Sequence, residues 1–461
     1  MAQLVGRRQG GGQHPLGRLL GSRQEGRSAG RGTQVGLLAL AVLGYLAQRQ
    51  QLLGLEEPAV FLKDFKQEYL LARAVLDGAN PYVPASVLAE RYLPESLSYV
   101  PANVIPHPPL VAALSTPLGL LSYQAASVVW LGLEAVFLLL SLLLIARGLR
   151  WTASAAGLFT LYGILLLWPP VWGGLLYGQL STSLTFLLVG CWLALKRGRD
   201  GLAGMLVGLA AAIKLVPLAL VAYFLIKRRW RPAAWAVGTF VAAFLLGATV
   251  IGLDGLRSYV ADGLPVAAYY RAAEGNHSLF GAVWRLFAGS LQVEPALDLA
   301  FLAAPVATLA SALLLLEAGR RVLRANDLDL EYSLVICAVL LASPLTWQHY
   351  FLMALPALCV AADRLYRHGW DRVQTNLLLA TVLMLSLPPG PVLALSSALA
   401  QLSGANPSRL PLPAVAGLPL VLLPIGLILL YVLLARQLAV APRREADSTE
   451  ARMVAPAPAA E

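Results

Sequence analysis

The stretch GLAGMLVGLAAAIKLVPLALVAYFLI (residues 201–226) is apolar except for Lys214, and a basic cluster lies on each side of it. These clusters are Lys196/Arg197/Arg199 and Lys227/Arg228/Arg229/Arg231. A single helix across a membrane would leave one cluster outside, although Lys and Arg favour the cytoplasmic side. We therefore expect two short helical arms with a break near Lys214 and Pro217, because proline and the residue before it disfavour helix. The irregular tip must line a cavity, since lipid does not satisfy exposed backbone groups.

Long apolar runs between short basic clusters recur along most of the chain. Of its 461 residues, 58% are hydrophobic and 13% are charged, whereas a soluble protein has about 25% charged residues. The net charge of +10 resides in short clusters, among them also Arg364/Arg367/Arg372. These clusters act as orientation signals, so nucleic-acid binding is not predicted. Cys191, Cys337 and Cys359 lie within apolar runs and predict no disulfide. The chain is predicted to be an all-α polytopic membrane protein.

Placing every basic cluster in the cytoplasm fixes a topology of about twelve transmembrane helices in one domain, residues 35–435. The expected helices are 35–53, 123–146, 152–172, 180–195, two arms within 201–226, 232–252, 296–317, 330–343, 349–363, 374–388 and 413–435. The first and fourth external loops, 54–122 and 253–295, are large, and 107–122 is expected to be re-entrant or interfacial. Short outer turns are expected at 173–179 and 343–350. A disordered basic tail, 1–34, and a disordered tail, 436–461, are expected in the cytoplasm of a plasma-membrane protein.

Two charged residues need a partner in this arrangement. Asp64 begins an amphipathic helix that is expected to stop at Gly78, so it is either an N-cap or a general base, and the two roles are compatible. Lys214 lies in an apolar segment, where an unpaired cation costs about 2.5–3.5 kcal/mol. A phosphate would offset this cost, and snorkelling toward the membrane surface is the alternative.

Further polar and aromatic residues fall on the expected outer side. They are His107, Gln179, Asn276, His277, Trp347 and His349. The three histidines have no local ligand spacing, so zinc binding is not predicted. Gln179 and Asn276 are suited to bind hydroxyl groups or to cap helices, and Trp347 is either an interfacial anchor or a platform for a sugar or prenyl chain.

Taken in order, these segments resemble glycosyltransferase family 87, the polyprenol-phosphate-mannose-dependent mannosyltransferases of the GT-C superfamily. The resemblance runs from about residue 60 to 365. It rests on Asp64-Phe65 with Ala72-Arg73 and Asn80-Pro81-Tyr82, His107-Pro108-Pro109-Leu110, Tyr177-Gly178-Gln179, Gly204 to Pro217, Gly275-Asn276-His277-Ser278-Leu279, and Ser343-Pro344 with Trp347-Gln348-His349. Familiar family forms have Gln at the position of His277 and often an acidic residue at that of Gln348.

The resemblance implies a GT-C fold, with a single GT-C-like domain over residues 35–435, and an enzyme of the cell envelope. No cofactor is expected, since the sequence contains no metal motif and no nucleotide-binding loop. Asp64 would deprotonate an acceptor hydroxyl, which attacks the anomeric carbon of a polyprenyl-phosphate hexose, expected to be mannose, with inversion. The acceptor would be a lipid or glycan on the extracytoplasmic side. The implied substrate-binding residues are Arg73, His107, Gln179, Lys214, Asn276, His277, Trp347 and His349, with Lys214 and His349 near the phosphate.

Three alternatives stay open. A transporter or flippase of a lipid-linked sugar would also need a buried lysine and broken helices, although such proteins often contain inverted repeats and this chain has large asymmetric outer loops. A non-catalytic membrane scaffold would leave Lys214 unexplained. Within the enzyme class, an arabinosyl or glucosyl donor is an alternative to mannose.

Overall fold

The computed structural model describes residues 31–53, 64–94, 102–152, 154–404, 406 and 411–440. In these ranges the chain is helical apart from connecting segments and two isolated bridges, Pro84 to Val104 and Val293 to Leu412. This confirms the predicted all-α membrane fold. The expected tails, 1–34 and 436–461, lie outside the described residues except at their inner edges, where the first described helix begins at Arg31 and the last described helix ends at Val440.

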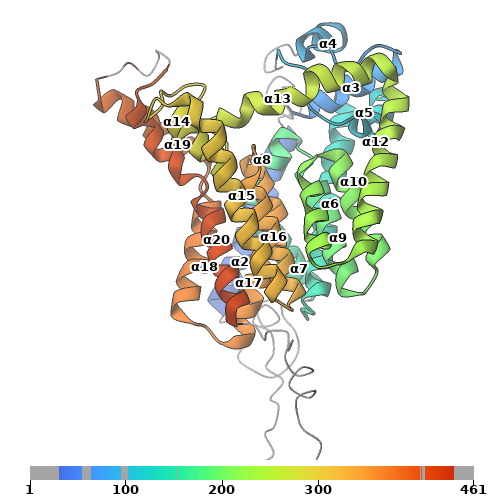
Figure 1. Ribbon diagram of the computed structural model, residues 1–461. Coiled ribbons are helices and arrows are strands. Elements are labelled where there is room, and N and C mark those ends of the chain that lie inside the picture. Colours follow the sequence, from blue (N-terminus) through green and yellow to red (C-terminus); the bar gives the residue numbers. More distant parts are fainter. Residues whose placement is uncertain are drawn as a thin grey trace, which may run out of the picture.

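Helix pairs build the body of the molecule (Figure 1). The element order begins with α2 (Arg31–Leu53), α3 (Phe65–Leu76), α4 (Ala85–Tyr92), α5 (Pro109–Ser115), η3 (Thr116–Leu120), α6 (Tyr123–Gly148), α7 (Ala155–Leu166), α8 (Pro169–Tyr177) and α9 (Ser181–Lys196). It continues with α10 (Asp200–Ile213), η4 (Val216–Ala219), α11 (Leu220–Ile226), α12 (Trp230–Ser258), η5 (Tyr259–Gly263), α13 (Leu264–Tyr269), η6 (Tyr270–Ala272) and α14 (Leu279–Ala288). The last elements are α15 (Ala300–Arg324), α16 (Leu328–Ala342), η7 (Gln348–Ala354), α17 (Leu355–His368), α18 (Arg372–Leu385), α19 (Pro389–Leu402), η8 (Ala414–Leu422) and α20 (Ile425–Val440). Among the helix pairs with the most extensive contact are α6 with α9, α10 with α12, and α2 with α7.

Four described helices are long and apolar enough to cross a membrane, or six if two bent pairs each form one span. The four are Tyr123–Gly148, Trp230–Ala272, Ala300–Arg324 and Ala414–Val440. Helix length and composition alone do not establish the predicted count of twelve transmembrane helices, which stays a prediction.

The expected break in the stretch 201–226 is present. Helix α10 ends at Ile213, Lys214 has extended backbone angles (φ −152°, ψ 126°), and η4 begins at Val216. Asp200 at the start of the first arm lies 3.7 Å from Arg229, just beyond the second arm. The two arms therefore return to the same end of the bundle, as predicted.

Three expectations need correction. The predicted helix 152–172 is broken, because α7 ends at Leu166 and α8 leaves at 73° with Pro169 in its first turn. Helix α8 also occupies most of the predicted turn 173–179, which shrinks to the residues around Gly178. The segment between the predicted helices 374–388 and 413–435 contains a further helix, α19, and η8 forms the first part of the predicted last span.

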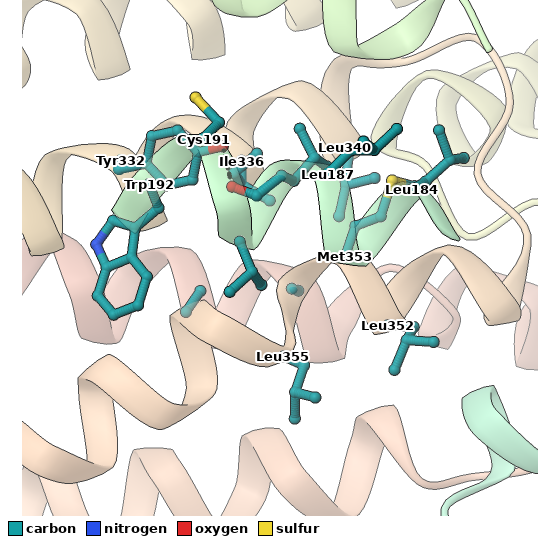
Figure 2. Packing of buried hydrophobic residues seen from close by; sticks show 14 of the residues in the cluster. Leu184, Leu187, Cys191, Trp192, Tyr332, Ile336, Leu340, Leu352, Met353 and Leu355 are labelled. Carbon is teal, nitrogen blue, oxygen red and sulfur yellow. Dashed lines mark hydrogen bonds between the residues drawn. The ribbon is translucent and has the colours of Figure 1, made fainter. Parts of the chain in front are cut away.

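The interior between α9, α16 and the η7–α17 segment is apolar. Figure 2 shows Leu184 and Leu187 of α9 facing Leu340 of α16, with Leu352 and Met353 beneath them. Each of these side chains is less than 8% exposed. The three cysteines are free thiols. This packing fixes the position of η7, which carries the candidate site residue His349.

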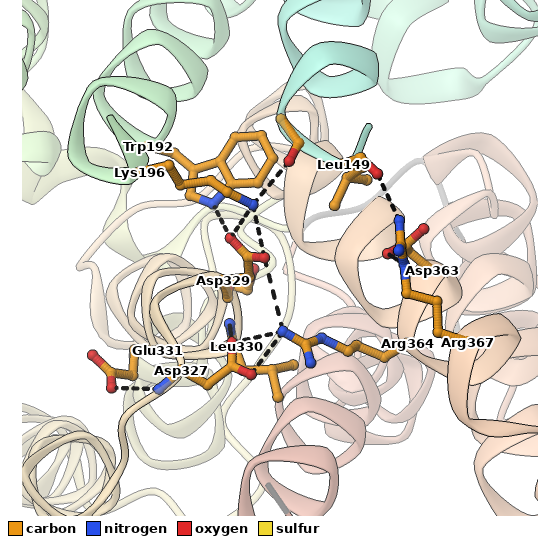
Figure 3. A network of polar contacts seen from close by, with 12 residues as sticks. Leu149, Trp192, Lys196, Asp327, Asp329, Leu330, Glu331, Asp363, Arg364 and Arg367 are labelled. Atoms are coloured by element: carbon orange, nitrogen blue, oxygen red, sulfur yellow. Dashed lines mark hydrogen bonds and ion pairs between the residues drawn. The ribbon is translucent and has the colours of Figure 1, made fainter. Parts of the chain in front are cut away.

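Ion pairs join the helix ends at one end of the bundle, which we call the basic end (Figure 3). Lys196 contacts Asp329 at 2.8 Å, Lys227 contacts Glu331 at 3.0 Å, and Arg364 contacts Asp327 at 2.7 Å. Three of the predicted basic clusters thus meet around the start of α16. The helices α3, α4, α5, α13 and α14 lie at the opposite end, the loop end, at the top of Figure 1.

Candidate active site

Asp64 stands at the start of α3, but its side chain does not cap that helix. Instead, Oδ2 accepts a hydrogen bond of 2.7 Å from Nε2 of Gln179. The Asp64 amide donates to the Tyr177 carbonyl at 3.0 Å. The start of α3 is therefore attached to the turn after α8, and the carboxylate is oriented by a neutral donor.

The turn that presents Gln179 depends on Gly178. Gly178 adopts left-handed angles (φ 73°, ψ 37°), which favour glycine. The chain then turns so that the Gln179 amide donates to the Gly174 carbonyl at 2.8 Å. Trp130 of α6 donates from Nε1 to the Gly178 carbonyl at 2.9 Å. Backbone and side-chain bonds thus hold Gln179 beside Asp64.

Lys214 and His349 both contact Tyr350. The Lys214 ammonium is 4.1 Å from the centre of the Tyr350 ring, and no carboxylate in the described ranges is within ion-pair distance of it. The Tyr350 ring packs against the His349 ring at 4.9 Å. A Cβ on Gly174 would lie 3.7 Å from the His349 Cβ. Helix α8 and η7 therefore connect Asp64, Gln179, His349 and Lys214 through direct contacts.

Asn276 ties two loops together. Its Nδ2 donates to the Arg271 and Pro344 carbonyls, both at 2.8 Å, and its Oδ1 accepts from the Ser278 and Thr346 amides, both at 3.0 Å. These four bonds use the hydrogen-bonding capacity of the amide within the protein. The structure places Asn276 as a support of the loop before η7, and its contact with a substrate stays a prediction.

His277 belongs to the same junction. Its amide donates to the Thr346 carbonyl at 2.7 Å, its Nδ1 is 3.2 Å from the Leu423 carbonyl, and its ring meets the Phe351 ring edge to face. Burial lowers the pKa of His277 to about 4, although the hydrogen bond to Leu423 opposes this shift. The imidazole is neutral at physiological pH, so Nδ1 carries the proton donated to the carbonyl.

The remaining predicted site residues lie around these groups. Trp347 meets the Tyr270 ring at 6.1 Å and is partly exposed. Arg73 donates from Nη1 to the Gly119 carbonyl at 3.1 Å. His107 lies 3.0 Å from Glu68, one turn after Asp64 on α3. Arg73 and His107 thus both belong to the lobe built on α3.

Two buried carboxylates close to these residues were not predicted from the sequence. Glu68 is one, and Glu134 of α6 is the other, which accepts hydrogen bonds from Thr182 and Ser183 at the start of α9. An acidic residue inside a long apolar run is a signal that could have identified Glu134. Through these two hydrogen bonds Glu134 holds the start of α9, which directly follows Gln179. Among the described residues, no group of three His, Cys, Asp or Glu residues could hold a metal ion.

A many-helix membrane protein with a carboxylate, a lysine and histidines connected near its loop end has the features of a membrane-embedded glycosyltransferase. Residues 106–344, more than half of the chain, match the model of glycosyltransferase family 87, and the chain belongs to this family.

Two relatives illustrate the likeness. A polyprenol-phosphate-mannose-dependent alpha-(1-2)-phosphatidylinositol mannoside mannosyltransferase of Mycobacterium tuberculosis strain H37Rv is 29% identical over 73% of this chain and 76% of its own. A polyprenol-phosphate-mannose-dependent alpha-(1-2)-phosphatidylinositol pentamannoside mannosyltransferase of Mycolicibacterium smegmatis is 28% identical over 54% of this chain and 59% of its own. No solved structure matches the chain.

Proposed function

We propose that this enzyme transfers mannose from a polyprenyl-phosphate-mannose donor to a hydroxyl group of a glycolipid acceptor, with Asp64 as the general base. The activities for which its relatives are named supply the donor and the kind of acceptor. The observation that carries the assignment of Asp64 is its hydrogen bond with Gln179 in place of a helix cap. A carboxylate oriented in this way is suited to accept a proton.

The transfer is a substitution at the anomeric carbon. Asp64 takes the proton of the acceptor hydroxyl, the oxygen forms a bond with the anomeric carbon, and the bond from that carbon to the phosphate oxygen breaks. Polyprenyl phosphate leaves with the electron pair, and the configuration is inverted. Lys214 and His349 are suited to offset the charge on the phosphate, because fixed donors stabilise charge that develops in the transition state. An α-linked product then requires a β-linked donor.

The reaction is assigned to the extracytoplasmic side. Three predicted cytoplasmic clusters meet at the basic end of the bundle, and Lys and Arg favour the cytoplasm. The loop end, with Asp64 nearby, is then extracytoplasmic, and both termini are cytoplasmic.

Asp64→Asn tests the role of the base. Purified protein receives radiolabelled polyprenyl-phosphate-mannose and a membrane lipid extract, and the products are separated. We expect transfer to fall by about 10²–10⁴-fold, the usual contribution of a general base, with donor binding retained because the shape of the residue is kept. Asp77→Asn, at the end of the same helix in an ion pair with Arg91, is the matched control.

Near-normal turnover of Asp64→Asn would remove Asp64 from the role of base. Movement of the labelled donor across vesicles without any glycosylated product would instead indicate a flippase.

A further inference from the structure

Helix α3 carries a second carboxylate on the face of Asp64. Glu68 follows Asp64 by one helical turn, a spacing that brings side chains to within about 5–6 Å at their Cβ atoms. The Glu68 side chain is 2% exposed and that of its neighbour His107 is 11% exposed. The two carboxylates therefore belong to one surface of the helix, at its start.

The contact between Glu68 and His107 leaves polar atoms unsatisfied. The His107 Nδ1 lies 3.0 Å from Glu68 Oε1, but it is not aligned as a hydrogen bond. The second oxygen, Oε2, is buried without a hydrogen-bond donor from any described residue. The backbone of His107 is fixed, because Tyr82 donates its hydroxyl proton to the His107 carbonyl at 2.7 Å.

A buried carboxylate oxygen without a donor is unfavourable, because burial removes its hydrogen bonds with water and no protein hydrogen bond replaces them. The missing partner must donate a hydrogen bond. A phosphate does not fit, because two carboxylates one turn apart repel an anion. A sugar hydroxyl fits, since it is neutral and donates one proton.

We propose that Glu68, positioned by His107, is a further sugar-binding residue whose Oε2 accepts a hydrogen bond from a hydroxyl of the transferred sugar or of the acceptor sugar. This inference rests on the proposed function. In this proposal His107 holds Glu68 in place. Asp64 at the start of α3 transfers the proton, and Glu68 one turn later binds the sugar.

The test is the steady-state kinetics of Glu68→Gln with each substrate varied in turn. We expect KM to rise at least tenfold for the substrate whose hydroxyl Glu68 binds, with the melting temperature of the detergent-solubilised protein unchanged. A rise for the donor places the hydroxyl on the transferred sugar, and a rise for the glycolipid places it on the acceptor. Glu90→Gln, an exposed carboxylate on α4, is the control and should leave both KM values unchanged.

Deoxy substrates provide a second measure that holds even if Glu68→Gln does not fold. Removing the bound hydroxyl should raise KM for the wild-type enzyme but add little in Glu68→Asp, whose shorter side chain no longer reaches it. The proposal would be overturned if KM in Glu68→Gln stayed within twofold of wild type. It would also be overturned if every deoxy substrate raised KM equally in wild type and in Glu68→Asp. A wild-type enzyme that transfers no sugar would instead overturn the proposed function.

Discussion

At the scale of single residues, Lys214 has no carboxylate within ion-pair distance among the described residues. It lies at the C-terminal end of α10, where the helix dipole favours a cation, and over the face of Tyr350. Neither the partial charge of the helix end nor the Tyr350 ring balances the full positive charge of an ammonium group. The Lys214 ammonium can therefore still bind an anion, which is the reason to expect a phosphate there.

We predict that Lys214→Met weakens the binding of polyprenyl phosphate and of the mannose-loaded donor alike, because both contain the phosphate. Hydrogen bonds to charged groups contribute about 1.5–3 kcal/mol, so the loss should be about 10- to 100-fold in Kd. The affinity for the glycolipid acceptor should not change. Titration of the purified variant measures this, with the exposed Arg197→Met as control. Unchanged donor affinity in the folded variant would support snorkelling.

His277 predicts a dependence of stability on pH. Its pKa is about 4 in the folded protein and about 6.5 in an unfolded chain. Between these values the unfolded state binds more protons, so the free energy of unfolding decreases as the pH falls from about 6.5 to 4, by about 3 kcal/mol in total. Chemical unfolding in detergent at several pH values measures this decrease, and His277→Gln should remove that part of it. An equal decrease in the variant would contradict the prediction.

At the scale of elements, close contact between α10 and α12 supports the helix that ends at Lys214. The small residues Gly204 and Gly208 meet the backbone of α12. A Cβ on Gly208 would lie 2.4 Å from the Ala236 carbonyl oxygen. The position of Lys214 therefore depends on a surface that has no room for a side chain.

Gly208→Leu should separate these two helices. Overpacking costs about 1–3 kcal/mol and occasionally more, and here the obstacle is backbone that a side-chain rotation does not move. We expect a lower melting temperature and reduced donor binding. Gly238→Leu on α12 is the matched control, because a Cβ there meets nothing within 4 Å. Equal stability of the two variants would show that α10 and α12 are not packed as described.

At the scale of the whole molecule, the separation of a basic end from a loop end predicts the orientation in the membrane. In a variant without the three natural cysteines, Glu90→Cys on α4 should react with a membrane-impermeant thiol reagent only from outside. Arg197→Cys, after α9, should react only from the cytoplasmic side. Both positions are exposed. The reverse pattern would invert the topology and move the reaction to the cytoplasm.

The sequence by itself determined the class of fold, the main helices and the break at Lys214. Hydropathy, basic clusters and proline act over about 20 residues or fewer, so they can be read locally. It also singled out Asp64, Lys214 and His349, because a charged or polar residue next to an apolar run needs an explanation.

Only the tertiary structure decided what those residues contact. The Asp64–Gln179 bond joins residues 115 positions apart, and the Glu68–His107 contact and the loop junction at Asn276 also join separate segments. The bend between α7 and α8 and the presence of α19 likewise differed from expectation. Such features depend on how helices pack against one another, and no local periodicity encodes which distant side chain will supply a hydrogen bond.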